Sequence, residues 1–128
     1  MQKINLGLIG CGFLGSRHLK TFHSLRNKVN ITAICDHHVE HIKPLARQYH
    51  LPYETDYRNL IGKVDAVSIC TPTVTHFEIA KFFLENNIHT FVEKPITYTI
   101  DEAQILIDLA KNIHGSGCQR ARAFGSQV

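Results

Sequence analysis

A short glycine-rich stretch near the N-terminus has the composition of a phosphate-binding turn. The apolar run from Ile4 to Ile9 leads directly into Gly10-Cys11-Gly12-Phe13-Leu14-Gly15, which has the spacing G-x-G-x-x-G. At this spacing Gly10 allows a tight turn, Gly12 lets the backbone approach a pyrophosphate, and Gly15 lets the next helix pack on the strand. That helix N-terminus offers N–H groups and a positive dipole to the phosphates. The pattern predicts a dinucleotide site, and a glycine turn without a ligand is the alternative.

A carboxylate follows at the distance where dinucleotide folds recognise a ribose. The second apolar run, Val29 to Cys35, ends in Asp36, which stands 21 residues after Gly15. A carboxylate about 20 residues beyond the glycines hydrogen-bonds the adenosine ribose hydroxyls in such folds. It would also repel a 2′-phosphate, and no arginine stands at 37 or 38 to bind one. We therefore expect NAD rather than NADP, with a solvated turn carboxylate or a helix N-cap as the alternative role of Asp36.

The other expected elements bring further polar residues to the same place. Continuous apolar runs predict five strands, at residues 4–9, 29–35, 51–53, 64–70 and 88–92. Apolar residues at helical spacing predict helices at residues 13–25, 39–50, 56–61, 76–85 and 100–113. This alternation predicts a Rossmann-type, doubly wound α/β fold, with about five parallel strands and helices on both faces. Its ligands bind at the carboxyl ends of the strands, where Thr71-Pro72 and Glu93-Lys94-Pro95 also fall.

Local signals mark the ends of several helices. Thr75-x-x-Glu78 and Thr99-x-x-Glu102 have the pattern of capping boxes at the starts of the last two helices. Asn86-Asn87 is expected to end the helix before the fifth strand, because asparagine tolerates the left-handed conformation. These signals set the lengths of the helices that flank the expected ligand edge.

Composition limits the class of protein. The chain has 128 residues and a net charge of +3, and it carries neither a basic stripe for nucleic acid nor an apolar run of the ~20 residues that would cross a bilayer. These are the features of a single soluble domain. Met1-Gln2-Lys3 leads straight into the first strand without a secretory signal, so we expect a cytoplasmic protein with no membrane or nucleic-acid partner.

The four cysteines show no C-x-x-C pair and no spacing typical of a disulfide framework. We therefore expect free, buried thiols and no metal site. The alternative is a zinc site at the strand ends, built from Cys11, Cys35 and Cys70 with His37 and His38 nearby.

Three motifs occur in an order typical of one oxidoreductase family. They are Gly10 to Gly15 with His18; Val64 to Pro72 followed by His76 and Glu78; and Val92-Glu93-Lys94-Pro95-Ile96-Thr97. With these motifs the chain resembles the N-terminal domain of the glucose-fructose oxidoreductase and inositol dehydrogenase (Gfo/Idh/MocA) family. The resemblance covers most of residues 3–112. It implies an NAD(P)-dependent oxidoreductase that transfers hydride between the nicotinamide and a secondary alcohol carbon of a sugar, cyclitol or nucleotide sugar.

The resemblance also assigns roles to single residues. It implies that Thr71 and Pro72 line the dinucleotide crevice, that His76 shapes the loop beside the cofactor, and that a cis peptide bond precedes Pro95. Lys94 is the implied catalytic residue, whose ammonium would hydrogen-bond the reacting oxygen, stabilise alkoxide charge and orient the nicotinamide ribose. The implied cofactor-binding set is Gly10, Cys11, Gly12, Phe13, Leu14, Gly15, Asp36, Thr71, Pro72, His76, Glu93, Lys94 and Pro95.

The end of the chain departs from the family pattern. Family members continue with a sixth strand and a second α/β domain, which binds substrate and supplies a histidine acid/base. Residues 114–128 instead form a segment rich in Gly, Ser and Arg, without a strand-like run. We therefore expect a dinucleotide domain at 1–113, an atypical tail at 114–128, and no catalysis by the chain alone.

Several histories and functions fit that ending. A shifted reading frame, an artificially shortened chain or a degraded gene would each produce it. A partner chain that completes the active site, and a non-catalytic NAD(H)-binding or interaction module, are the alternative functions. A missing sixth strand would leave residues 88–92 as an open apolar edge. We therefore expect a homo-oligomer, with the tail wrapping back or exchanging between chains.

Overall fold

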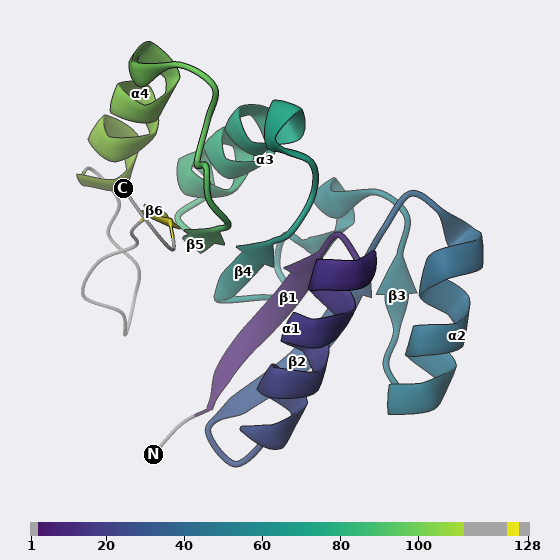
Figure 1. The fold of residues 1–128 in the computed structure, drawn as a ribbon. Coiled ribbons are helices and arrows are strands. Elements are labelled where there is room, and N and C mark those ends of the chain that lie inside the picture. Colours follow the sequence, from purple (N-terminus) through teal and green to yellow (C-terminus); the bar gives the residue numbers. More distant parts are fainter. Residues whose placement is uncertain (1–2, 112–122, 126–128) are drawn as a thin grey trace.

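A computed structural model of the chain describes residues 3–111 and 123–125. Its strands are β1 (Ile4–Ile9), β2 (Val29–Cys35), β3 (Tyr53–Glu54), β4 (Ala66–Ile69), β5 (His89–Val92) and β6 (Ala123–Gly125). Its helices are α1 (Phe13–Ser24), α2 (Val39–Tyr49), α3 (Thr73–Glu85) and α4 (Ile100–Lys111), with a short 3₁₀ helix, η1 (Tyr57–Leu60). The strands form one sheet in the order β3-β2-β1-β4-β5-β6, and every neighbouring pair is parallel (Figure 1).

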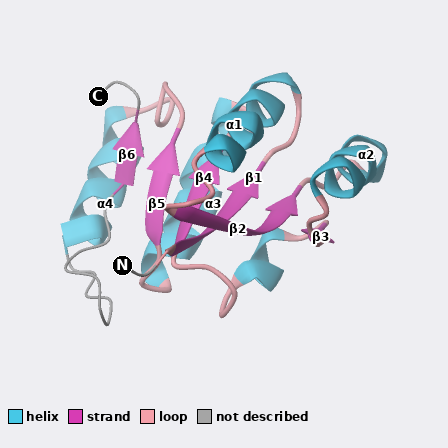
Figure 2. Cartoon of the chain, turned by 90° about the horizontal axis from the view of Figure 1, so that it is seen from below, coloured by secondary structure: helices cyan, strands magenta, loops and turns pink. Residues whose placement is uncertain are grey.

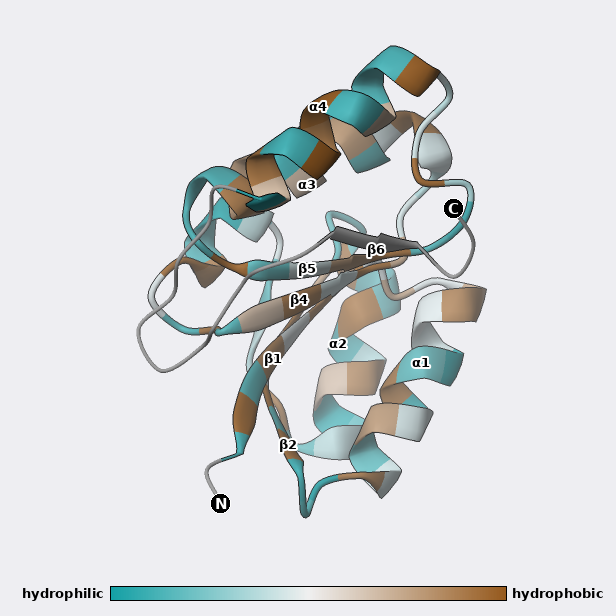
Figure 3. Cartoon of the chain, turned by 90° about the vertical axis from the view of Figure 1, so that its left-hand side faces the viewer, coloured by the Kyte–Doolittle hydropathy of each residue, from teal (hydrophilic) through white to brown (hydrophobic). Residues whose placement is uncertain are grey.

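Helices cover both faces of the sheet, as the continuous apolar strands predict. Helices α1 and α2 lie on one face and α3 and α4 on the other (Figure 3). The α1/α2 face packs around Leu8, Leu19, Ile34 and Ile42, and the α3/α4 face packs around Ile9, Val67, Ile69, Phe83, Leu84 and Leu106. The predicted doubly wound fold is confirmed. In the described part of the chain, no helix has the length and apolar character needed to cross a membrane.

Strand β1 is the centre of the fold, because it pairs with β2 on one side and with β4 on the other. The strand order therefore reverses between β1 and β4. In open parallel sheets a crevice forms at such a reversal, outside the carboxyl ends of the strands. The turn that begins at Gly10 and the loop that begins at Cys70 both start there.

Helix α3 begins earlier than the capping-box pattern predicted. The helix starts at Thr73, directly after Pro72, so Thr75 lies inside the first turn and not at the N-cap. The Thr75 hydroxyl lies 2.6 Å from both the Pro72 carbonyl oxygen and Thr71 Oγ1. That prediction is wrong because Pro72, with its fixed φ, already provides the backbone geometry of a helix start.

Other local predictions agree with the structure. The Glu102 N–H donates to Thr99 Oγ1 at 3.1 Å at the start of α4, as the second capping box predicted. Asn87 has the expected positive φ of 60°. Asp56 caps η1 by accepting the Arg58 N–H at 3.0 Å. The edge strand β3 lies at Tyr53–Glu54, later than the predicted 51–53.

The sheet has a sixth strand that the sequence did not predict. Strand β6 pairs in parallel with β5, with Ala123 opposite Thr90 and Gly125 opposite Val92 (Figure 2). The expectation of an open edge at residues 88–92 is therefore wrong, and the argument for self-association through that edge no longer holds. Residues 112–122 and 126–128 lie outside the described residues, so the predicted boundary and character of the tail stay predictions.

The glycine turn gives a matched pair of substitutions. A Cβ at Gly15 would collide with the Gly10 carbonyl oxygen, whereas a Cβ at Gly12 would meet no described residue within 4 Å. We expect Gly15→Ala to lower the free energy of unfolding by about 3 kcal/mol. Gly12→Ala should cost less than about 1 kcal/mol, because it changes only the N-cap residue of α1. Urea unfolding followed by circular dichroism measures both values, and equal losses would contradict the packing role of Gly15.

Candidate functional site

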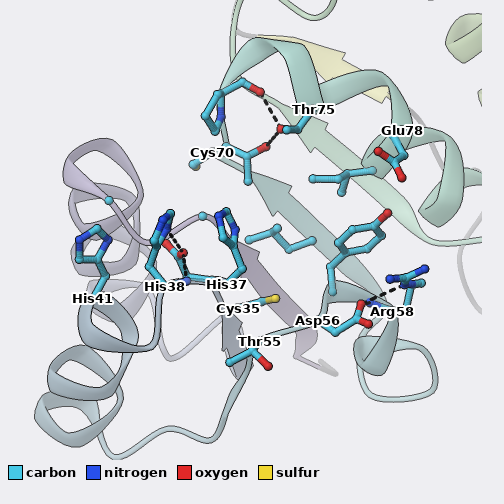
Figure 4. Close-up of a pocket in the computed structure, with 18 residues that line it drawn as sticks. Cys35, His37, His38, His41, Thr55, Asp56, Arg58, Cys70, Thr75 and Glu78 are labelled. Atoms are coloured by element: carbon cyan, nitrogen blue, oxygen red, sulfur yellow. Dashed lines mark hydrogen bonds and ion pairs between the residues drawn. The ribbon is translucent and has the colours of Figure 1, made fainter.

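A cleft of about 760 Å³ lies at the carboxyl ends of β1, β2 and β4, where the strand order reverses (Figure 4). Five of the predicted cofactor residues line it: Gly10, Gly12, Asp36, Thr71 and Pro72. Its other walls come from the start of α2, from η1 and from the first turns of α3. The structure thus brings the glycine turn, the carboxylate and the Thr-Pro loop together as predicted.

The glycine turn brings backbone, not side chains, to the cleft. Gly10 has a φ of +91°, and a Cβ there would lie 2.8 Å from the Cys70 carbonyl and 2.9 Å from the Thr71 nitrogen. The N-cap residue of α1 is Gly12, which has no side chain to accept a hydrogen bond from the N–H groups of the first turn. The first-turn N–H groups of an α-helix have no partner within the helix, so an anion can accept from them here.

Cys11, Phe13 and Leu14 are also suited to act through their backbone atoms. The Cys11 side chain is buried in the core between the sheet and α1/α2. Phe13 and Leu14 are 81% and 43% exposed, and neither side chain lines the cleft. The side chains at the x positions of G-x-G-x-x-G therefore do not line the cleft, and the Cys11 N–H donates to Asp36.

Asp36 is a polar group of the cleft whose two carboxylate oxygens are both held by backbone N–H groups. Its Oδ2 accepts the Cys11 N–H at 2.9 Å, and its Oδ1 accepts the His38 N–H at 2.9 Å. Burial raises the pKa of this carboxyl, but the hydrogen bonds from His38 and Cys11 outweigh that effect and hold the pKa below its ordinary value. Asp36 is therefore a fixed carboxylate only 9% exposed, and its remaining lone pairs can accept from a ligand's hydroxyl groups.

The Thr71-Pro72 loop is tied to the loop after β5 by His76. The buried His76 ring has Nε2 2.8 Å from the Thr71 carbonyl oxygen, and Nδ1 3.0 Å and 3.1 Å from those of Pro95 and Ile96. Carbonyl oxygens only accept, so the ring donates to both loops at once only when both nitrogens carry a proton. His76 shapes the loop from behind and does not line the cleft, which refines its predicted place beside the cofactor.

Glu93, Lys94 and Pro95 stand outside the cleft at the end of β5. Glu93 Oε1 lies 2.9 Å from Nε2 of His18, so this contact connects α1 to the end of β5. Lys94 is exposed, and the Lys94–Pro95 peptide is cis, as the resemblance implied. The predicted set therefore divides into one group around Asp36 and a second group around Lys94.

Sequence reasoning assigned no part in cofactor binding to the outer wall of the cleft. His37, His38 and His41 line one side, and Asp56, Tyr57, Arg58, Glu78 and Ile79 line the other (Figure 4). Burial raises the pKa of the Tyr57 hydroxyl, and the charge of Glu78 raises it further. The N-cap signal at Asp56 located η1, but no spacing rule indicated that η1 faces Asp36 across the cleft.

Cys11 and Cys35 are buried free thiols, as predicted, whereas Cys70 is free but only partly buried. Burial is the main cause that raises the thiol pKa to about 12 in Cys11 and in Cys35, and to about 11 in Cys70. Among the described residues, the group with metal-ligand spacing consists of Asp36, His37 and His38 and includes no cysteine. The structure therefore gives no support to the zinc alternative based on the three thiols, and Cys118 lies outside the described residues.

Thiol burial has a chemical consequence. The thiolate is the reactive form, and Cys11 and Cys35 are 2% and 3% exposed with a pKa of about 12. We expect iodoacetamide at about pH 8 to alkylate both at least about a hundredfold more slowly than free cysteine. Peptide mass spectrometry measures the rates. Both sites should react at the normal rate in urea, and fast alkylation of the native chain would contradict their burial.

Loss of His76 should destabilise the fold. We expect His76→Ala to lower the free energy of unfolding by about 3 kcal/mol, because it opens a buried void and removes the ring that contacts the carbonyl oxygens of both loops. His41→Ala, at an exposed histidine of α2, should change stability by less than about 0.5 kcal/mol. Urea denaturation of both variants makes the comparison, and a tolerated His76→Ala would show that the two loops are held by other contacts.

Comparison with known proteins agrees with this geometry. Residues 4–116 match the model of an oxidoreductase family with an NAD-binding Rossmann fold, Gfo/Idh/MocA. UDP-N-acetylglucosamine 3-dehydrogenase of Acidithiobacillus ferrooxidans is 32% identical over 114 residues, which are 89% of this chain and 36% of that protein. Its solved structure superimposes with a TM-score of 0.80 and covers 87% of this chain and 36% of its own.

Two further relatives extend the comparison. An alpha-N-acetylgalactosaminidase of Shewanella oneidensis is 34% identical over 123 residues, covering 87% of this chain and 27% of its own. The solved structure of an NAD-binding protein from Listeria innocua is 30% identical with a TM-score of 0.82, covering 98% of this chain and 35% of its own. The chain spans about a third of the length of the relatives it matches. Because the family model matches residues 4–116 of 128, the chain belongs to the Gfo/Idh/MocA oxidoreductase family and carries its NAD-binding Rossmann domain.

Proposed function

We propose that the cleft holds the adenosine and pyrophosphate of NAD(H), with Asp36 on the adenosine ribose. The observation that carries this proposal is the position of the Asp36 carboxylate, 2.9 Å from the N–H of Cys11 inside the glycine turn. The groups suited to a ribose and to a pyrophosphate thus stand next to each other, as a dinucleotide requires. The exposed backbone at Gly12 and the start of α1 would face the phosphates.

The same carboxylate supports the preference for NAD over NADP. Asp36 is held ionised by the N–H groups of His38 and Cys11. A 2′-phosphate on the ribose would meet this negative charge at close range, without an arginine at 37 or 38 to offset it. Thr71 and Pro72, which line the opposite wall of the cleft, would contact the cofactor on its way to the nicotinamide end.

The nicotinamide end of the proposed site is the loop after β5. Bound NAD would supply the hydride acceptor of the reaction. Lys94 would hydrogen-bond the reacting oxygen and stabilise alkoxide charge, and Glu93 and Pro95 would flank the ring. His76 would act as a positioning residue, because its ring joins the Thr71 carbonyl to those of Pro95 and Ile96. His18 would steady the Glu93 side chain through their 2.9 Å contact.

The relatives support a nucleotide sugar as the substrate class. One relative at 32% identity is a dehydrogenase of UDP-N-acetylglucosamine, and it is almost three times as long as this chain's match to it. We propose oxidation of a secondary alcohol on such a sugar. The substrate site and the acid/base partner of Lys94 would come from a part that this chain does not share with its relatives, in the same polypeptide or in a partner chain.

Calorimetric titration with NADH and NADPH tests the cofactor proposal. We expect tighter binding of NADH than of NADPH. Asp36→Asn should weaken NADH binding about tenfold or more, because the ribose hydroxyls lose a charged acceptor, and it should narrow the preference for NADH. Glu40→Gln, at an exposed acid of α2, is the matched control and should leave both affinities in place. Tighter binding of NADPH by the parent chain would overturn the role of Asp36.

A turnover assay tests whether the chain binds the cofactor but lacks catalytic activity on its own. The 128-residue chain mixed with NAD and UDP-N-acetylglucosamine should bind cofactor but form no NADH, because hydride transfer needs an acid/base partner and a site that excludes water. NADH absorbance follows the reaction. Turnover by the chain alone would show that its own residues complete the active site.

A further inference from the structure

One wall of the cleft adds two histidines, which the proposed cofactor binding does not use, to the carboxylate that it does use. Asp36, His37 and His38 each offer one ligand atom, and the three atoms lie within 4.8 Å of one another. Figure 4 shows both histidines at the end of the cleft where α2 begins. Imidazole nitrogens with a carboxylate oxygen form a ligand set that suits zinc and related divalent transition metals.

The spacing between two of these ligands already fits a tetrahedral ion. Asp36 Oδ1 and His38 Nδ1 are 3.3 Å apart. Two ligand atoms at zinc's usual bond lengths of about 2.0–2.1 Å stand roughly 3.4 Å apart when the angle between them is tetrahedral. The His37 and His38 rings lie with their centroids 4.1 Å apart, and both rings are exposed. His37 offers a nitrogen as the third ligand atom, within 4.8 Å of the other two ligand atoms.

The backbone around the carboxylate supplies the outer contacts that a metal ligand needs. The N–H groups of Cys11 and His38 hold the two oxygens of Asp36, which fixes its orientation before any ion binds. His41 lies further along the same wall, with its ring centroid 5.1 Å from that of His38, and is not one of the three clustered ligands. Three protein ligands leave the fourth position of a tetrahedral ion for water.

We propose that Asp36, His37 and His38 form a zinc site that excludes NAD(H) from the cleft. The exclusion rests on the proposed function, because the oxygen that would bind the ion belongs to the carboxylate proposed to accept from the adenosine ribose. Zinc and NAD(H) would then compete for one side chain, and zinc would act as an inhibitor of cofactor binding.

The metal site is tested first without cofactor. Calorimetric titration of the full chain with zinc chloride should show one tight zinc per chain. His37→Gln and His38→Gln should each weaken that binding by at least about tenfold, since even outer-shell partners of metal sites cost this much when removed. His41→Gln is the matched control and should keep the parent affinity. The site would be overturned if the parent chain bound no zinc. It would also be overturned if His41→Gln lost zinc binding while His37→Gln and His38→Gln kept it.

The exclusion is tested by repeating NADH titrations in the presence of zinc. At a zinc concentration ten times its own Kd, the apparent Kd for NADH should rise about tenfold and return with EDTA. In the variant carrying both His37→Gln and His38→Gln, the same zinc should not change that variant's Kd for NADH. An unchanged or lowered apparent Kd in the parent chain would overturn the exclusion. NADH titration without zinc separately tests the proposed function.

Discussion

The hydrogen bond from the Cys11 N–H to the Asp36 carboxylate joins the two sequence features on which the site is built. It connects the turn after β1 to the end of β2, and it runs between groups that the chain places 25 residues apart. A carboxylate that is only 9% exposed needs such donors to stay ionised, and the turn needs an acceptor for a buried N–H. This one contact therefore holds the glycine turn in place, helps to keep Asp36 ionised, and sets the distance between the turn and the carboxylate.

The opposite wall is held by different means. The His76 ring joins the loops after β4 and β5 through backbone carbonyls, and the His18–Glu93 pair connects α1 to the end of β5. These contacts involve no atom that lines the cleft apart from the Thr71 loop. The Thr71-Pro72 loop is thus held by polar side chains that lie behind it and contact its backbone, outside the surface that faces a ligand.

The sequence predicted the parts of this arrangement that depend on local pattern. Apolar runs, the three glycines and the offset of Asp36 each report on a single segment, and the β2 bounds agree residue for residue. It failed where distant segments decide the outcome. A three-residue strand such as β6 is too short to show a hydrophobic pattern, and its partner β5 lies more than 30 residues earlier in the chain. Tertiary packing likewise sets the position of η1 opposite Asp36 and the contact between His18 and Glu93. The start of α3 was misplaced because Pro72 begins the helix before the capping-box threonine, Thr75.

The parallel pairing of β1 also determines when the fold can be completed during synthesis. Parallel neighbours need a long crossover between them, and the Asn5–Asp65 contact that accompanies the β1–β4 pair spans 60 residues. Until the ribosome has delivered β4, β1 keeps one unpaired edge, which is a template for contact with other chains. The crevice and its N–H-lined turn do not exist before that point. Nascent chains of this protein are therefore exposed to misassembly through their central strand until the residues between β1 and β4 have been synthesised.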